Sequence, residues 1–437
     1  MTRRTSSLRW GLAAVAGILM AVSLVGGVLV VVRAQSFAGP VERPAISLPP
    51  TTAAPTPSQQ PTATPSQDVD PGGPPADTVH VGDRHRARYH GRYADWEGLL
   101  AAGTTLPKVS KGCRADWQRS RRDDALDWGK AGFLCLDKLT GNGFKPQGVA
   151  GSGTTTAYRI GARAAHQRNI VLVSSYSAVA EKGLLFPHQP GRTETTRLTV
   201  IDLDHRRYNT VELIRPTAAG GFTALDSHGS GLAWVGQYLY SSSRGSLWLY
   251  NVDDLMTIKG RYVLPAVARW KVQGTGGLSS LTVDRSMTRP RLTGINYSET
   301  GTAWTQSFAL DTTGLVRPPS RNAKHELTLS RAYGPVAASV RSASSSVVPG
   351  TNYQGVGTAG RYRIVNSSSL MLDGRRHGDN MVILRKDTMI ARFSMPSENI
   401  ESLYVDPRRN RYLTITEHGR QFLFWLPLDH LIDRAER

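Results

Sequence analysis

Short runs of apolar residues, separated by turn residues, follow one another along the chain beyond residue 144. Between residues 231 and 255, the runs LAWV, QYLYSS and SLWLYNV are separated by Gly236 and by Arg244-Gly245. Aromatic and aliphatic runs of this length, with glycine between them, predict an antiparallel meander of β-strands. The same plan returns at residues 402–431, and related runs occur at 156–204, 280–311 and 355–394.

These strand units recur along the chain. They begin near Gln147, His228, Gly277, Gln354 and Glu401, so that successive starts are 81, 49, 77 and 47 residues apart. A period of about 45 residues that is lengthened by insertions is typical of the blades of a β-propeller. We therefore predict an all-β fold, with a five-bladed β-propeller over residues 144–437. Two units within 277–353 would make six blades, and a β-sandwich is the alternative architecture.

The start of the chain has a different pattern. Residues 1–38 combine a basic stub with 22 uncharged, mostly apolar residues from Gly11 to Val32. A helix of that length reaches about 33 Å, enough to cross a hydrocarbon core of about 30 Å. With arginines before this helix and a disordered Pro/Thr/Ser-rich linker at 39–79 after it, we predict a signal anchor in the cell membrane, with a cytoplasmic N-terminus and an extracytoplasmic C-terminal domain. The alternative is a signal peptide whose cleavage yields a secreted protein.

Residues 80–143 form a short segment between the linker and the repeats. Apolar residues at helical spacing predict one helix within 90–103 and a second over 115–132. Cys113 and Cys135 flank the second helix. In an exported protein, two cysteines this close in sequence predict a disulfide, and a catalytic thiol is the alternative.

Polar residues mark the starts of several units and predict a site at the mouth of the central channel. Gln147 and Gln354 each precede Gly-Val, while His228 and Glu401 occupy the corresponding place in their own units, with Asp226 close to His228. The inner strands of a propeller begin at one end of its channel, so these side chains are expected to converge as ligand-binding residues. Glu401 and His228 would be the catalytic acid and base if the protein is an enzyme. The alternative is that these groups hydrogen-bond to neighbouring blades and hold the ring together.

Three stretches of the chain resemble a family of actinobacterial exported, membrane-anchored β-propeller-like proteins of unknown function. They are CLDKLTGNGFKPQGV, the unit from His228 to Leu255, and ENIESLYVDPRRNRYLTITEHGRQFLFWLPLD. The resemblance extends over roughly residues 110–437, and it implies a propeller fold and an exported protein.

A second resemblance concerns only the starts of the blades. Pro146-Gln147-Gly148 is similar to the Pro-x-Gly segments of senescence-marker, strictosidine-synthase-like and lactonase-type propellers. In those families acidic and amide side chains in the channel hold a divalent metal, so the resemblance implies Ca²⁺ or another divalent ion here. The corresponding positions of this chain hold one Glu, two Gln and a His. No P-loop, Gly-x-Ser-x-Gly elbow, His-Glu-x-x-His or EF-hand loop is present, so no cofactor is evident from motifs, and Glu417-His418 is predicted to be a surface turn.

Composition narrows the class of protein. Two cysteines exclude a multi-disulfide scaffold and a cysteine-based zinc module, and a single long apolar stretch excludes a polytopic membrane protein. The 53 Lys and Arg against 34 Asp and Glu give a net charge of +19. A basic surface outside the membrane attracts anionic polymers. The arginines are dispersed, so no sequence-specific nucleic-acid partner is expected.

These observations favour a membrane-tethered, extracytoplasmic propeller that binds a ligand or partner in the cell envelope, such as an anionic polymer. The alternative is a propeller hydrolase or lyase that uses Glu401 and His228 at the channel, with a divalent metal.

Overall fold

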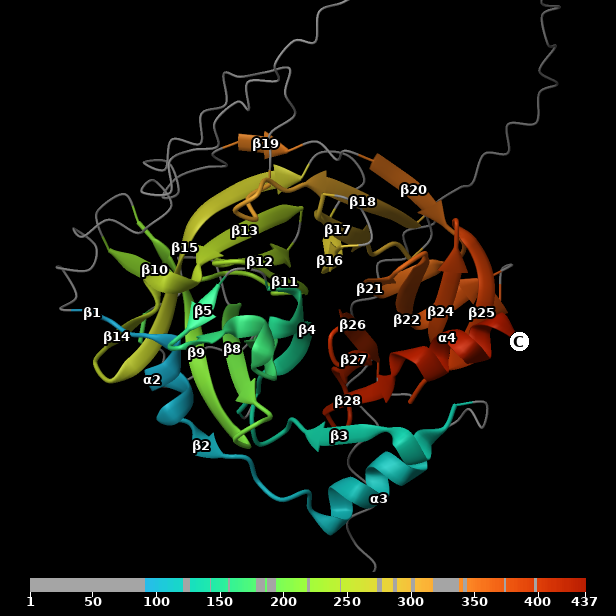
Figure 1. Ribbon diagram of the computed structural model, residues 1–437, viewed down its shortest axis with the longest axis horizontal. Helices are drawn as coiled ribbons and strands as arrows, with labels where there is room; N and C mark the ends of the chain where they lie inside the picture. Colours follow the sequence, from blue (N-terminus) through green and yellow to red (C-terminus); the bar gives the residue numbers. More distant parts are fainter. Residues whose placement is uncertain are drawn as a thin grey trace, which may run out of the picture. The chain divides into compact units, whose positions relative to one another are not determined.

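The structure is a computed structural model. It describes residues 91–120, 126–141, 143–155, 158–177, 185–186, 194–217, 221–243, 245–272, 277–285, 289–299, 303–316, 338–340, 344–372, 375–396 and 399–437 (Figure 1). The predicted anchor and the linker at 39–79 lie outside these residues. Contacts divide the chain into Met1–Asp68 and Val69–Arg437, and all described residues belong to the second unit. Within them, no helix has the length and apolarity that crossing a membrane requires.

Five antiparallel sheets of four strands, which we call blades 1 to 5, make up most of the described chain. Blade 1 consists of β4 (Lys145–Gly151), β7 (Ile170–Ser177), β8 (Thr195–Asp202) and β9 (Arg207–Pro216). Blade 2 consists of β11 (Gly231–Val235), β12 (Tyr238–Ser243), β13 (Ser246–Asn251) and β15 (Arg261–Val272). Blade 3 consists of β16 (Leu278–Asp284), β17 (Arg291–Asn296), β18 (Ala303–Ala309) and β20 (Ser344–Val348). Blade 4 consists of β21 (Thr351–Ala359), β22 (Tyr362–Leu372), β24 (Asp379–Arg385) and β25 (Thr388–Ser394). Blade 5 consists of β26 (Ile400–Asp406), β27 (Arg411–Thr416), β28 (Phe422–Pro427) and β3 (Gly132–Cys135).

The first strands of the blades contact one another in a closed series. β4 contacts β11, β11 contacts β16, β16 contacts β21, β21 contacts β26, and β26 contacts β4 again. The blades therefore surround one axis, as Figure 1 shows in the passage from green through yellow to red. The fold is a β-propeller. The described strands form five blades, and the stretch 277–353 contributes one of them.

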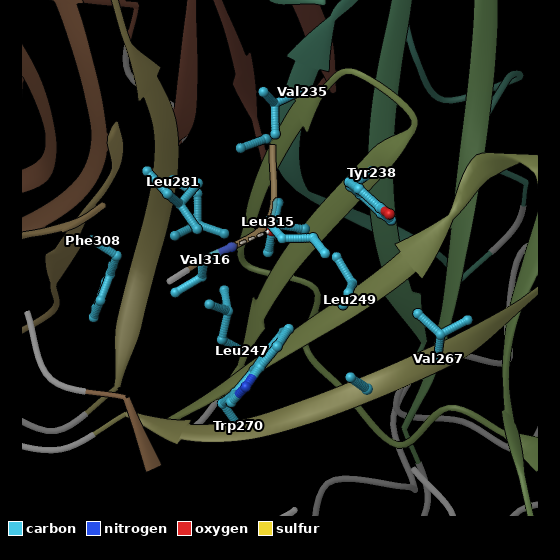
Figure 2. Packing of buried hydrophobic residues seen from close by; sticks show 14 of the residues in the cluster. Val235, Tyr238, Leu247, Leu249, Val267, Trp270, Leu281, Phe308, Leu315 and Val316 are labelled. Carbon is cyan, nitrogen blue, oxygen red and sulfur yellow. Dashed lines mark hydrogen bonds between the residues drawn. The ribbon is translucent and has the colours of Figure 1, made fainter. Parts of the chain in front are cut away.

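Each gap between neighbouring blades contains its own hydrophobic core, because successive side chains of a strand point to opposite faces of its sheet. Leu232 and Trp234 of β11 pack toward blade 1, whereas Ala233 and Val235 pack toward blade 3. Figure 2 shows the core between blades 2 and 3, where Leu315 and Val316 lie between Leu281 and Leu249. Three further clusters lie between blades 3 and 4, 4 and 5, and 5 and 1. Because both faces of these strands are covered, nearly every residue along a strand is buried, rather than every second residue.

Glycines allow the inner strands to approach one another at the axis. A Cβ on Gly231 would lie 2.6 Å from the backbone nitrogen of Leu281, and one on Gly355 would lie 2.9 Å from the carbonyl oxygen of Glu401. Neither position has room for a side chain. The small residues at the blade starts are therefore required by the crowding of five strands.

Blades 1 and 2 are also joined at their outer edges, since Tyr262–Pro265 of β15 pairs in parallel with Val211–Ile214 of β9. Shorter strands extend these edges: β1 (Arg92–Tyr93), β2 (Thr104–Thr105), β10 (Phe222–Ala224), β14 (Met256–Ile258) and β19 (Ala338–Val340). Elsewhere, β5 (Arg159–Ile160) pairs with β6 (Arg163–Ala164), and β23 (Arg375–Arg376) pairs with β22. Helix α4 (Leu428–Glu436) contacts β25 and β28. Four 3₁₀ turns occur in the described chain: η2 (Trp128–Lys130), η3 (Ser152–Thr154), η4 (Ala165–Gln167) and η5 (Val252–Asp254).

The segment predicted to be helical contains helices shorter than expected. Helix α2 (Trp96–Ala101) lies within the expected 90–103, and the indole nitrogen of Trp96 donates a 2.8 Å hydrogen bond to the carbonyl of Val252. Helix α3 (Lys111–Ser120) begins before the expected 115–132 and ends within it. The last residue of that expected range, Gly132, begins the strand β3 (Gly132–Cys135).

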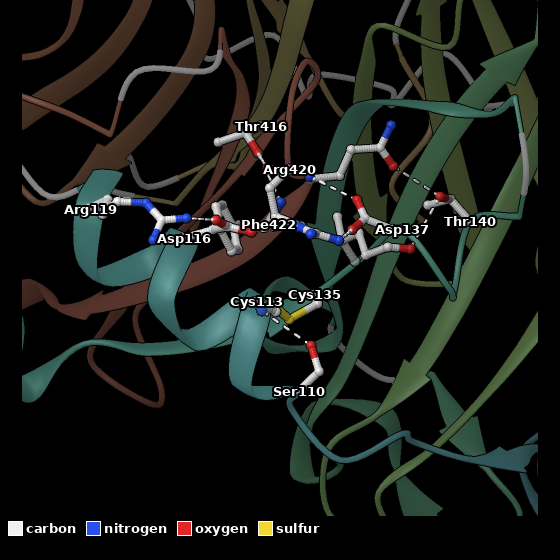
Figure 3. Close-up of polar contacts among 12 residues, drawn as sticks. Ser110, Cys113, Asp116, Arg119, Cys135, Asp137, Thr140, Thr416, Arg420 and Phe422 are labelled. Carbon is white, nitrogen blue, oxygen red and sulfur yellow. Dashed lines mark hydrogen bonds and ion pairs between the residues drawn. A yellow bond between two sulfur atoms is a disulfide. The ribbon is translucent and has the colours of Figure 1, made fainter. Parts of the chain in front are cut away.

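β3 completes blade 5, although it is separated from the other strands of that blade by the rest of the propeller. Leu134 pairs with Leu423 of β28, and Cys135 pairs with Phe422. The predicted boundary between 143 and 144 therefore separates this strand from the propeller domain to which it contributes. The expected disulfide joins Cys113 of α3 to Cys135 of β3 (Figure 3).

Polar contacts hold the same helix and strand against blade 5. Nε of Arg420 donates to Oδ2 of Asp116 at 3.0 Å, and one of its terminal nitrogens donates to Oδ2 of Asp137 at 2.7 Å (Figure 3). The indole of Trp117 stacks on Phe133 with ring centroids 4.9 Å apart. The N-terminal segment is thus fastened to the propeller by a covalent bond, by ion pairs and by aromatic packing.

Candidate functional site

Three of the predicted site residues occupy equivalent places at the starts of inner strands. Gln147 on β4, Gln354 on β21 and Glu401 on β26 each precede a small residue at the crowded axis, namely Gly148, Gly355 or Ser402. Each of these inner strands belongs to the closed series that surrounds the axis. Their side chains have different surroundings.

Glu401 is a buried acid. It is 1% exposed, and it lies beside Glu417, which follows the end of β27. Burial raises the pKa of Glu401 well above 4.5, and the negative charge of Glu417 and a hydrogen bond with that residue raise the pKa further. The two carboxyl groups therefore share a proton, with Glu401 as the protonated partner.

Glu417 also connects the acid pair to blade 1. The hydroxyl of Tyr176 on β7 donates a 3.2 Å hydrogen bond to Oε1 of Glu417, and Nζ of Lys145 lies 3.8 Å from the same oxygen. Burial and the nearby charge of Glu417 raise the pKa of Tyr176, which keeps its hydroxyl protonated as a donor. The carboxylate of Glu417 thus accepts hydrogen bonds from Glu401 and Tyr176 and faces the ammonium group of Lys145.

His228 joins the same group of side chains through an aromatic contact. Its ring stacks on Tyr176 with centroids 3.8 Å apart, and its Nδ1 lies 3.0 Å from Oε1 of Glu194. A continuous series of contacts therefore connects His228 to Glu401 through Tyr176 and Glu417. We call Tyr176, Glu194, His228, Glu401 and Glu417, with Lys145, the acid cluster.

Of the two members of the acid cluster that the sequence indicated, His228 is accessible and Glu401 is not. The side chains of Lys145 and His228 are 44% and 31% exposed, and that of Glu417 is 11% exposed. Glu401 is enclosed behind them. A ligand at this end of the blades would contact Lys145, His228 and Glu417, while Glu401 would act through Glu417.

For Gln147 and Gln354, the described chain shows no side-chain hydrogen bond to the acid cluster. The side-chain amide of Gln147 donates to the carbonyl of Pro146 at 3.2 Å. Gln354 is half-buried on β21, and no hydrogen bond links its side chain to the cluster among the described residues. Asp226 is half-buried in the segment before β11.

Three members of the acid cluster, Lys145, Tyr176 and Glu194, were missed by sequence reasoning, and one was misread. Glu417-His418 was predicted to be a surface turn; His418 is indeed 45% exposed, but Glu417 points inward beside Glu401. Tyr176 lies on β7 of blade 1, a strand that has no polar motif. Glu194 directly precedes β8, and a charged residue at the start of a buried strand was the available signal.

A metal centre was expected from resemblance alone. Among the described residues, no group of three or more His, Cys, Asp and Glu side chains has the arrangement of a metal site.

Comparisons with known proteins add little to this description. No family model matches the chain, and no curated protein matches it. Among solved structures, glutaminyl cyclase from Myxococcus xanthus is similar with 11% identity and a TM-score of 0.34, over 65% of this chain and 90% of that one. The WD40 repeats of RRP9 match with 9% identity and a TM-score of 0.35, over 70% and 99%. The β-propeller domain of Cps50 (Swd1) from Myceliophteria thermophila matches with 10% identity and a TM-score of 0.26, over 59% and 93%. Scores this low carry no argument about the site or its chemistry.

Proposed function

We propose that the protein is a membrane-tethered, extracytoplasmic β-propeller that binds an anionic polymer of the cell envelope at the acid cluster. The observation that carries this proposal is the layered arrangement of Lys145 and His228 at the surface over the buried Glu401–Glu417 pair. Burying two carboxyl groups disfavours folding unless their geometry is well satisfied. Such a pair is better explained by the need to hold the exposed groups in place than by stability.

The expected ligand follows from the exposed groups and the charge of the whole chain. The side chains of Lys145, His228 and His418 are all partly exposed, and each carries a nitrogen that can donate a hydrogen bond. A net charge of +19 attracts polyanions from a distance and makes their binding dependent on salt. Phosphate-containing or carboxylated envelope polymers have the required chemistry.

The test uses the full chain, purified in a non-ionic detergent, with poly(glycerol phosphate) as the probe and dextran as the uncharged control. We expect the double variant Lys145→Gln/His228→Gln to weaken binding of poly(glycerol phosphate) by about tenfold or more, because it removes two of the exposed donors. Lys386→Gln, at an exposed turn of blade 4, removes one positive charge elsewhere and is expected to leave binding within about twofold. Equal weakening by both variants would show that only net charge matters and would refute a site at the acid cluster.

A second candidate function is that of a hydrolase or lyase. The observation in its favour is that a neutral carboxyl group and a His–Glu pair occur in one cluster, which is the combination that general acid–base catalysis requires. Mass spectrometry of the polymer after incubation with the protein separates the two functions. Cleavage by the natural chain that His228→Gln abolishes would establish an enzyme, whereas binding without cleavage supports the binding module.

The tether is tested separately, because the predicted anchor lies outside the described residues. We expect the full-length chain in the membrane fraction of cells. Recovery only from the culture medium would exclude a retained anchor and support cleavage of a signal peptide.

A further inference from the structure

A second site is suggested by a cavity at the other end of the blades. It has a volume of about 450 Å³ and lies where blade 5 meets blade 1. β27 begins with Arg411 at this cavity, whereas Glu417 of the acid cluster follows the end of the same strand. Six residues of extended chain span about 20 Å, so the cavity and the acid cluster are separate. The cavity is lined by Leu106, Val109, Arg114, Ala131, Gly132, Phe133, Leu134, Asn169, Leu203, Arg206, Arg411 and Trp425.

The polar part of this lining consists of three guanidinium groups and one amide. Arg411 extends from β27, Arg206 from the turn between β8 and β9, and Arg114 from α3. A terminal nitrogen of Arg411 donates to Oδ1 of Asn169 at 3.1 Å, which fixes one side of its planar group. No carboxylate belongs to the described lining. Arginine in such a setting binds carboxylates and phosphates through paired hydrogen bonds.

The acids nearest to this lining are already engaged by the protein. Oδ2 of Asp204 accepts from the backbone nitrogen of Asn169 at 3.0 Å. The carboxylate of Asp406 pairs with Arg409 at 3.1 Å and also accepts from the backbone nitrogen of Arg408. The charges of Asp406 and Asp204 nevertheless act on the guanidinium of Arg411. The surplus positive charge of the three lining arginines is left to a ligand or to solvent ions.

The other part of the lining is apolar and aromatic. Trp425 lies directly over Gly132, where any side chain would overlap with its ring. The guanidinium of Arg411 lies 5.9 Å from the centre of the same ring. Leu134 continues this surface along β3. The ring of Phe133 belongs to the opposite face of that strand, where it stacks on Trp117. A ligand in the cavity would therefore meet a flat apolar wall beside a group of cations.

We propose that this cavity binds an organic anion in which a carboxylate or phosphate is attached to a ring-sized apolar body. Arg411 and Arg206 hold the anionic group, and Trp425 and Leu134 pack against the body. The volume lies within the range of small-molecule sites, about 300–1,000 Å³. The site is independent of the acid cluster and of the polymer proposed to bind there.

Calorimetric titration of the full chain in non-ionic detergent tests the proposal, with phenyl phosphate as the probe. Benzoate tests the carboxylate, inorganic phosphate lacks the apolar body, and benzyl alcohol lacks the charge. We expect phenyl phosphate or benzoate to bind at least about tenfold more tightly than the last two. Whichever of phenyl phosphate and benzoate binds more tightly, which we call the better probe, identifies the anionic group. Absence of binding by both up to about 5 mM, or equal binding of inorganic phosphate, would overturn the proposal.

Two variants test whether the better probe binds in the cavity. Arg411→Gln and Arg206→Gln are each expected to weaken the binding of the better probe by about tenfold or more. Arg392→Gln, at an exposed position of β25 in blade 4, makes the same change of charge away from the cavity and should change affinity by less than about twofold. Arg206 lies in an exposed turn, so its variant decides the question if Arg411→Gln unfolds. Unchanged affinity in folded Arg206→Gln protein would refute the site.

Discussion

At the scale of single residues, the protonated state of Glu401 is the property with the clearest consequences. An ordinary glutamate ionises near pH 4.5, whereas burial and Glu417 keep Glu401 neutral well above that value. Between pH 4.5 and the raised pKa of Glu401, the folded chain holds a proton that the unfolded chain has released. The free energy of unfolding therefore falls as the pH rises through this range.

Replacing Glu401 by glutamine should remove this fall in the free energy of unfolding at higher pH. Glutamine cannot ionise, and its amide still donates to Glu417. We expect Glu401→Gln to match the natural chain near pH 5 and to be more stable near pH 8, with a slope of stability against pH that is shallower by up to about 1.4 kcal/mol per unit. Urea unfolding at several pH values measures this difference.

Glu299→Gln is the matched control, because Glu299 is exposed in blade 3. Its pH profile should coincide with that of the natural chain. If Glu401→Gln behaves in the same way, Glu401 is ionised in the folded protein and the proton-sharing pair does not exist.

The acid cluster shows which parts of a site can be predicted from sequence. Glu401 and His228 were predicted because they recur at the starts of strand units, and position within a repeat is visible in a single chain. Tyr176 and Glu417 were not found, since their link depends on β7 of blade 1 lying beside the end of β27 of blade 5. Periodicity within one blade holds no information about which blades are neighbours across the closure of the ring.

At the scale of single elements, the inner strands are limited by space. Gly231 begins β11, and a Cβ there would lie 2.7 Å from the carbonyl carbon of Ser280 on the next inner strand. Gly231→Ala should therefore destabilise the protein by about 1–3 kcal/mol or more, because two backbones would have to separate.

Gly112→Ala provides the comparison for that substitution. Gly112 lies in α3, where a Cβ would contact nothing within 4 Å. Alanine is the better helix former, so the free energy of unfolding should rise by about 0.5–1 kcal/mol. Thermal unfolding of both variants measures the contrast, and similar effects of the two changes would contradict the crowding of the axis.

The link between α3 and β3 gives a further prediction at this scale. The disulfide between Cys113 and Cys135 closes a loop of 22 residues, and on the chain-entropy model such a loop contributes about 3 kcal/mol. We expect Cys113→Ala/Cys135→Ala to lower the free energy of unfolding by about that amount. A reducing agent should lower the stability of the natural chain and leave the double variant unchanged. Insensitivity of the natural chain to reduction would contradict a structural disulfide.

At the scale of the whole molecule, the sequence allowed the propeller and its five blades to be predicted. The predicted unit starts at Gln147, Gly277, Gln354 and Glu401 lie within or next to β4, β16, β21 and β26, because turn glycines and strand periodicity are local signals. The fourth strand of blade 5 was not predicted. Gly132–Cys135 follows a segment with helical spacing, and its partner β28 is distant in sequence.

Removal of β3 tests its role in the ring. A chain that begins at Lys145 lacks β3, so the edge of β28 would lose its partner and could pair with another molecule. We expect this chain to elute as oligomers in size-exclusion chromatography and to unfold at a lower temperature than a chain that begins at Gly91. A monomeric, equally stable product would show that three strands suffice for blade 5.

The pairing of β3 with β28 also sets the order in which the protein can be completed during synthesis. Cys135 leaves the ribosome about 290 residues before its pairing partner Phe422, a delay of roughly 15–60 s at 5–20 residues per second. During this time four blades can form while β3 waits without a partner. The final blade assembles only after the last strands have emerged, so a nascent chain stalled before residue 422 retains an open ring and an unpaired strand that chaperones and proteases can recognise.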